Sequence, residues 1–248
     1  DNKVVQFATV SNRETPDGGS TILAGNQKVL SARLSDAKFF WDNDLRAIKT
    51  NGLDIWLEKL KKVTFHNKLG SQFERVERII NLSEIIAEKI GCDPKLAKDA
   101  AYISKADLSS EMVYEFPELQ GIMGTYYAKK AGYAASVSET CKDHYAPLGP
   151  SDEVPGSPIS TVVALADKID TLTNFWAIEE KPTGSKDPFA LRRSALGMIR
   201  IIIENDIRIS LSEILALGNK KADIEDLKEF IYQRMKVFLR EKELRHDI

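Results

Sequence analysis

Two aspartates, Asp167 and Asp170, are the residues whose surroundings point most directly to chemistry. They lie three residues apart in the segment ALADKIDTL (164–172), which is otherwise mostly apolar. On a helix this spacing places both on neighbouring positions of one face. A buried carboxylate is costly unless it is paired or hydrogen-bonded. Asp167 is therefore predicted to bind a cation, bind a ligand or meet a Lys or Arg, and a structural salt bridge is the interpretation that the segment alone favours.

A second candidate is the basic segment KPTGSKDPFALRRSALG (181–197). Its Pro/Gly loop carries Lys186 and precedes a predicted helix with Arg192 and Arg193, an arrangement that can bind phosphate groups. Adjacent residues on a helix diverge by about 100°, so at most one arginine points inward and the other is free for a partner. A solvated face with an internal salt bridge explains the pattern equally well, and both interpretations stay open.

The last predicted helix carries a smaller basic patch. Its basic residues, Arg234, Lys236, Arg240, Lys242 and Arg245, outnumber the acidic Glu241 and Glu243. For a charge run of this size, a plain solvated face is the favoured interpretation.

The remaining residue types that often do chemistry are scattered. His66, His144 and His246 have no neighbouring His or carboxylate at the usual metal-ligand spacing, and Cys92 and Cys141 form no CxxC pair. The sequence also has no P-loop, GxGxxG or GxSxG motif. The pattern therefore predicts neither a metal site nor a catalytic residue in this chain.

Composition limits the class of protein. The 248 residues are 43% hydrophobic, which allows a full core, and 35 basic against 37 acidic residues give a formal net charge of -2. Any RNA-binding surface must therefore be local. There is no apolar run of about 18 residues and no signal-peptide pattern. A reduced cytoplasmic protein without a membrane segment is expected, and the absence of an initiator Met reads as a fragment of a longer chain.

Hydrophobic periodicity predicts a mainly α, irregular helical bundle with a short strand in its N-terminal flank. The strand is expected over residues 3–10. Helices are predicted over 26–49, 52–62, 69–90, 94–106, 117–131, 158–176, 189–205 and 224–238. Gly91 is predicted to end one of them in a left-handed conformation, and Pro94 to open the next.

Four stretches together resemble the beta subunit of bacterial heterotetrameric glycyl-tRNA synthetase. They are ARLSDAKFFW (32–41), SKADLSSEMVYEFPELQGIMGTYYA (104–128), SPISTVVALADKIDTL (157–172) and GSKDPFALRRSALG (184–197). The resemblance covers essentially the whole chain. It implies that an alpha subunit carries the active site for glycine and ATP, with Mg²⁺, while beta binds and presents tRNA(Gly) in an assembly of two alpha and two beta subunits. No cofactor is then expected in this chain.

The resemblance also implies three parts. Residues 1–68 are expected to be a flanking segment that belongs to an adjoining domain. Residues 69–210 are expected to form a degenerate HD-like helical domain, and residues 211–248 to begin the helical region on the anticodon-binding side.

In HD hydrolases a metal is held by an early His, an adjacent His-Asp pair and a later Asp. Matched to that pattern, Gln72 stands at the early His, Ser104 and Lys105 stand at the pair, and Asp167 alone remains. One ligand is too few for a catalytic metal. We therefore predict that a Lys105–Asp167 salt bridge replaces it.

The resulting prediction is a catalytically inactive, tRNA-binding and subunit-bridging part of glycine–tRNA ligase. The candidate RNA contacts are Lys129, Lys130, Lys186, Arg192 and Arg193. The alternatives are an active HD-type, metal-dependent nucleotide phosphohydrolase and a purely structural bundle that holds alpha against the rest of beta.

Overall fold

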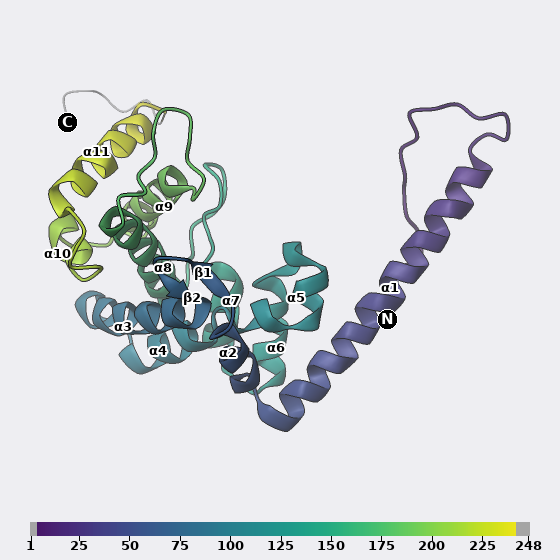
Figure 1. Cartoon of the computed structure of the whole chain (residues 1–248), viewed down its shortest axis with the longest axis horizontal. Coiled ribbons are helices and arrows are strands. Elements are labelled where there is room, and N and C mark those ends of the chain that lie inside the picture. The colour runs from purple at the N-terminus through teal and green to yellow at the C-terminus, as the bar shows by residue number, and fades with distance from the viewer. Residues whose placement is uncertain (1–3, 242–248) are drawn as a thin grey trace.

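The computed structural model describes residues 4–241 and confirms a mainly α fold (Figure 1). The α-helices are α1 (Ser20–Asn51), α2 (Asp54–Leu60), α3 (Gln72–Ile90), α4 (Pro94–Ile103), α5 (Glu111–Glu115), α6 (Ile122–Lys130), α7 (Ala135–Asp143), α8 (Pro158–Ala177), α9 (Leu191–Glu204), α10 (Leu211–Leu215) and α11 (Ile224–Glu241). Two short 3₁₀ turns are η1 (Ala106–Ser109) and η2 (Pro117–Leu119).

Helix α8 forms the axis of the bundle. Every residue from Ile159 to Trp176 is buried, and α3, α4, α7 and α9 pack around it. A helix surrounded on all sides is expected to be apolar all round. The polar residues of α8, Asp167 and Asp170 among them, are therefore forced into the interior and must find partners there.

Helix α3 has a defined cap at each end, and two of its arginines contact α8. Ser71 and Glu74 form a reciprocal capping box at its start, and Gly91 ends it with φ 73°. This C-terminal glycine confirms the predicted cap. Arg75 and Arg78, one turn apart, reach the aspartates of α8 from this helix.

Helix α4 ends directly before the buried turn that carries Lys105. Pro94 opens it as predicted, with Asp93 accepting backbone hydrogen bonds as its N-cap, and it stops at Ile103. Ser104 and Lys105 follow in the buried turn before η1. The end of α4 therefore places Lys105 in the interior.

The predicted N-terminal strand is wrong over the described residues 4–10, which form no strand. Val5 and Val10 are exposed there. A lone β-rich run leaves its backbone groups unpaired unless a second strand lies alongside. Instead, β1 (Thr64–His66) pairs antiparallel with β2 (Gly70–Ser71), directly before α3.

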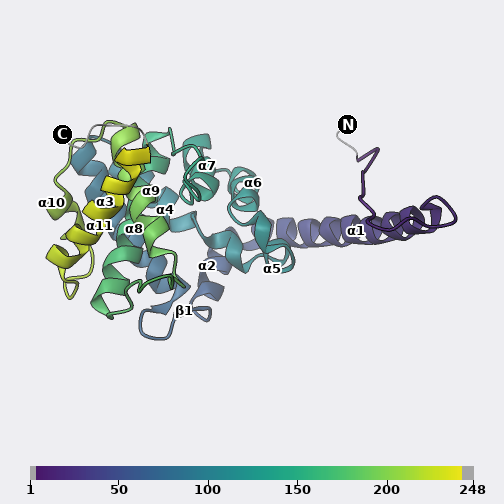
Figure 2. The same ribbon diagram turned by 90° about the horizontal axis from the view of Figure 1, so that it is seen from above.

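Helix α1 runs outward from the bundle, and only its C-terminal end is buried there (Figures 1 and 2). Asp44 and Ile48 are its buried residues. The Asp44 carboxylate accepts hydrogen bonds from the backbone amides of Glu111 and Met112 and, at 2.6 Å, from the Tyr127 hydroxyl. This one side chain therefore joins α1 to α5 and α6.

Two glycines allow α6 to approach its neighbours closely. A Cβ on Gly121 would lie 2.7 Å from the Cys141 carbonyl oxygen, and one on Gly124 would lie 3.0 Å from the Asp107 carboxylate. Both glycine amides donate to Asp107 Oδ2, at 2.6 and 3.0 Å. The lack of a side chain at both positions thus allows close packing and lets both amides bind the buried Asp107 carboxylate.

Helix α11 packs against α9 and α8, and the short α10, which the periodicity does not predict, packs against α11 and α8. The proposed division at residues 68 and 210 remains a prediction. None of the helices within residues 4–241 is both long and apolar enough to span a membrane.

Candidate functional site

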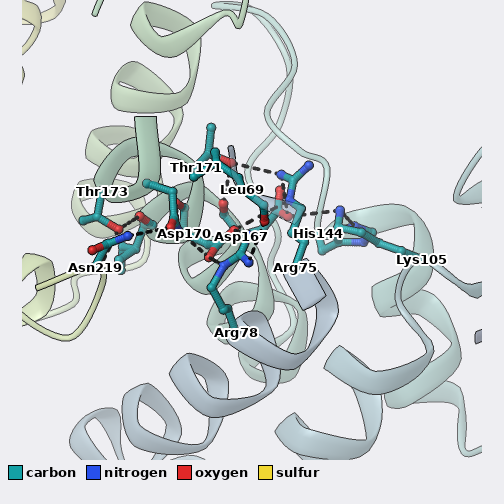
Figure 3. Close-up of polar contacts among 12 residues, drawn as sticks. Leu69, Arg75, Arg78, Lys105, His144, Asp167, Asp170, Thr171, Thr173 and Asn219 are labelled. Atoms are coloured by element: carbon teal, nitrogen blue, oxygen red, sulfur yellow. Dashed lines mark hydrogen bonds and ion pairs between the residues drawn. The ribbon is translucent and has the colours of Figure 1, made fainter. Parts of the chain in front are cut away.

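A buried network of ion pairs surrounds Asp167 (Figure 3). Lys105 Nζ and Arg75 Nη2 each lie 3.0 Å from Asp167 Oδ1. Only 2% of the Lys105 side chain and 11% of the Asp167 side chain are exposed. The predicted Lys105–Asp167 salt bridge is therefore present, while its interpretation as the replacement of a metal site stays a prediction.

Asp170, one turn further along α8, has its own partners. Arg78 donates to its carboxylate through Nε at 2.6 Å and through Nη2 at 3.3 Å. Asn174 Nδ2 donates at 2.8 Å, and Arg75 Nε lies 3.8 Å away. Each aspartate of the pair thus meets an arginine of α3, as expected for buried carboxylates.

Lys105 has a second polar contact, with the imidazole of His144. Its Nζ lies 3.0 Å from His144 Nε2, and His144 Nδ1 lies 2.8 Å from the Thr140 carbonyl oxygen. A carbonyl oxygen can only accept, so Nδ1 carries the hydrogen and Nε2 accepts from the lysine ammonium. Burial first, and then the Lys105 charge, lower the pKa of His144 well below its usual value.

The charge state of Asp167 follows from its neighbours. Burial alone would raise its pKa, but the Arg75 and Lys105 charges outweigh burial and hold the pKa of this carboxyl well below its usual range. Asp167 is therefore ionised, and its negative charge is already matched by these two cations.

A pocket of 240 Å³ opens beside this network. Arg75, Asp167 and Lys168 line its polar side. Lys168 Nζ donates to the Ala146 carbonyl oxygen at 2.9 Å, and burial lowers the Lys168 pKa to about 8. A Cβ on Gly197 would lie only 2.6 Å from Lys168 Cε, so this glycine makes room for the lysine stem.

Two residues predicted at the degenerate site lie outside the network. Gln72 is the first residue of α3, and its buried Oε1 has no hydrogen-bond partner among the described residues. Ser104 donates its hydroxyl to the Ala101 carbonyl oxygen. The group of α3 that contacts Asp167 is Arg75, one turn beyond Gln72.

Sequence reasoning missed Arg75, Arg78, His144 and Lys168 as members of this site. The sequence did contain a pattern that could have identified the two arginines, Arg75 and Arg78. They flank Val76 and Ile79, which are fully buried, so their positions border the buried face of α3. Cations there are natural partners for aspartates on an apolar helix. No comparable signal links His144 to Lys105, because they are 39 residues apart.

The five predicted RNA contacts do not form one surface. Lys129 and Lys130 are exposed at the end of α6, and Lys129 pairs with Glu139 at 3.3 Å. Lys186 lies exposed in the loop before α9. Figures 1 and 2 show α6 and α9 on separate parts of the helical body.

The adjacent arginines of α9 differ as their helical spacing predicts. Arg192 is half-buried, and its Nη2 donates to the Gly184 carbonyl oxygen at 2.7 Å. Arg193 is exposed and forms no hydrogen bond or ion pair with another described residue. Arg193 is therefore the cation of the pair that is available to a partner.

Both arginines line a groove of 430 Å³ between α9 and α11, where Arg234 joins them. Asp187 is the one acidic residue among the described residues that line this groove. Its carboxylate accepts from the backbone amides of Leu191 and Arg192 at the start of α9. Buried Arg234 Nε has no hydrogen-bond partner among residues 4–241. The groove therefore offers more positive than negative charge.

Within residues 4–241, no group of three or more His, Cys, Asp or Glu side chains is arranged to hold a metal ion. The expectation that the chain contains no metal site stays a prediction.

Comparisons with known proteins agree over the whole chain. A family model described as the glycyl-tRNA synthetase beta subunit matches residues 1–248. The chain is 61% identical to the glycine–tRNA ligase beta subunit of Ruegeria sp. (strain TM1040) and 57% identical to that of Paracoccus denitrificans (strain Pd 1222). Each similarity covers 99% of this chain and 36% of the relative. The chain thus spans little more than a third of the relatives' length.

Proposed function

This chain belongs to the glycyl-tRNA synthetase beta subunit family, and we propose that it is the part of that subunit that binds and positions tRNA(Gly). The attachment of glycine is carried out by an alpha subunit with ATP and Mg²⁺. The chain itself supplies no catalytic residue. The proposal includes a cytoplasmic assembly of two alpha and two beta subunits.

The observation that carries the RNA-binding proposal is the arginine-lined groove between α9 and α11. Within residues 4–241, exposed Arg193 has no hydrogen-bond or ion-pair partner, and Arg234 Nε has no hydrogen-bond partner. RNA helices and loops are bound largely through phosphate and sugar contacts, for which guanidinium groups are well suited. The formal net charge of -2 makes such a local excess of cations necessary.

The groove is tested by reversing the charge of Arg193 in the full-length beta subunit assembled with alpha. The Arg193→Glu variant should bind tRNA(Gly) at least tenfold more weakly at low salt, and the slope of affinity against salt concentration should decrease. Arg208→Glu is the matched control, because Arg208 is exposed and follows the opposite end of α9. Equal tRNA affinity in the two variants would remove the groove from the RNA interface.

To separate the structural-bundle alternative from this proposal, the affinities of the Arg193→Glu variant for tRNA(Gly) and for the alpha subunit are both measured. If Arg193→Glu leaves tRNA binding intact but weakens association with alpha, the α9–α11 groove serves subunit bridging instead. The phosphohydrolase alternative has no specific observation in its favour. Asp167, its remaining ligand, is engaged by Arg75 and Lys105.

A further inference from the structure

The buried network contains more positive than negative charge. Four cations, Arg75, Arg78, Lys105 and Lys168, contact or lie beside the two carboxylates Asp167 and Asp170. Buried charges are normally paired, because an uncompensated one is expensive to desolvate.

A third carboxylate, Asp107, lies near Lys105 but offsets this excess only in part. It is bound by the backbone amides of Gly121 and Gly124, and burial raises its pKa to about 6. Even with Asp107 ionised, the four cations outnumber the three carboxylates. Arg78 is the most exposed of the cations, with 30% of its side chain exposed.

Two of these cations line the 240 Å³ pocket beside Asp167. Arg75 and Lys168 are these cations, and Arg193 lines the pocket as well. Buried Arg75 Nε has no hydrogen-bond partner among the described residues. Lys168 has three donor hydrogens and one hydrogen-bond acceptor among the described residues, the Ala146 carbonyl oxygen. The pocket thus offers unused donors as well as positive charge.

Aromatic side chains also line the pocket, and the Arg75 guanidinium lies 4.3 Å from the centroid of one of them, Phe65. Phe175 and Phe189 stack with ring centroids 4.2 Å apart, and both line the pocket together with Phe65 and Tyr145. Aromatic faces next to cationic donors suit a ligand that has a flat ring or sugar beside a phosphate group. The volume is below that of typical pockets for drug-sized ligands, so the ligand is small or enters only in part.

We propose that this pocket binds the phosphate group of a single nucleotide, held by Arg75 and Lys168 and flanked by the Phe175–Phe189 stack. The nucleotide is either a free mononucleotide or one nucleotide of a bound RNA chain. This site is distinct from the α9–α11 groove, although Arg193 lies where the two meet.

Ser194 provides a test that leaves the internal ion pairs intact. It lines the pocket from α9, and its side chain makes no hydrogen bond with another described residue. Ser194→Asp and Ser194→Asn introduce side chains of the same size that differ in charge. Binding of inorganic phosphate, adenosine monophosphate and tRNA(Gly) is measured by calorimetry with the full-length beta subunit assembled with alpha. Circular dichroism confirms that both variants fold.

For a free mononucleotide, the wild type should bind adenosine monophosphate, and Ser194→Asp should bind it at least tenfold more weakly than Ser194→Asn. For a nucleotide of RNA, the same difference should appear with tRNA(Gly), even if adenosine monophosphate does not bind. Equal affinities, or equal losses, in the two variants for every probe would overturn the proposal. Failure of the RNA-binding proposal gives a different result from failure of the pocket proposal, because the wild type itself would then not bind tRNA(Gly).

Discussion

Asp107 is a buried carboxylate whose titration changes stability in a defined direction. Burial raises its pKa to about 6 although Gly121 and Gly124 donate to one oxygen, and the other oxygen, Oδ1, has no partner among the described residues. In the unfolded chain its pKa is about 3.9. Its stabilising contribution is therefore complete below the unfolded pKa and is lost as pH rises through about 6.

We expect Asp107→Asn to become more stable relative to the wild type as pH rises from 4 to 7. The asparagine carbonyl oxygen can still accept from both glycines, and no carboxylate has to be ionised in the interior. The difference in unfolding free energy should change by up to about 3 kcal/mol over this range. Urea unfolding of both proteins at several pH values measures it, and parallel stability profiles would contradict the assigned titration.

The pH dependence of the wild-type unfolding free energy alone does not isolate Asp107, because His144 also titrates. The variant must therefore be compared with the wild type at each pH. The pKa of His144 is lowered by burial and by Lys105. The stability it contributes is present above the unfolded histidine pKa of about 6.5 and is lost as pH falls below it. This trend opposes that of Asp107, so the two titrations partly cancel in the wild type.

Asp44 joins three helices through one carboxylate, and its removal tests how α1 is attached. Asp44→Ala leaves the amides of Glu111 and Met112 and the Tyr127 hydroxyl without their acceptor. We expect a loss of about 2–4 kcal/mol in unfolding free energy, measured by urea unfolding. Asp36→Ala is the control, because Asp36 is an exposed residue of the same helix. Similar losses in both variants would mean that Asp44 contributes no more than helix propensity.

The helices that were predicted well are those with both a clear apolar pattern and a recognisable end. Gly91 and Pro94 separate α3 from α4 as expected, because each restricts the backbone in its own way. Residues 4–10 show the limit of local propensity, since a strand also needs a partner. The Lys105–Asp167 contact was predicted from the resemblance to a metal-site pattern, and nothing local in the sequence brings the two residues together.

At the scale of the whole molecule, the C-terminal part of α1 contacts the helical bundle and its N-terminal part is exposed. Arg33 pairs with Glu115 at 2.8 Å and lies over the Phe116 ring, so contact with the bundle extends at least to this point. Toward the N-terminus, Leu23 and Val29 are exposed. Figures 1 and 2 show this part of the helix leading away from the body.

A helix segment of this length is marginal in water without tertiary packing, and Gly25 weakens it further. We therefore expect trypsin to cleave the isolated 248-residue chain after Lys28 before it cuts within α3 to α9. Mass spectrometry of a time course of limited digestion identifies the first sites. Arg33 is the internal comparison, because its ion pair should delay cleavage after it relative to Lys28. First cleavage within the bundle would show instead that the N-terminal part of α1 is as well protected as the core, and the helix would then owe its stability to its own sequence and not to packing.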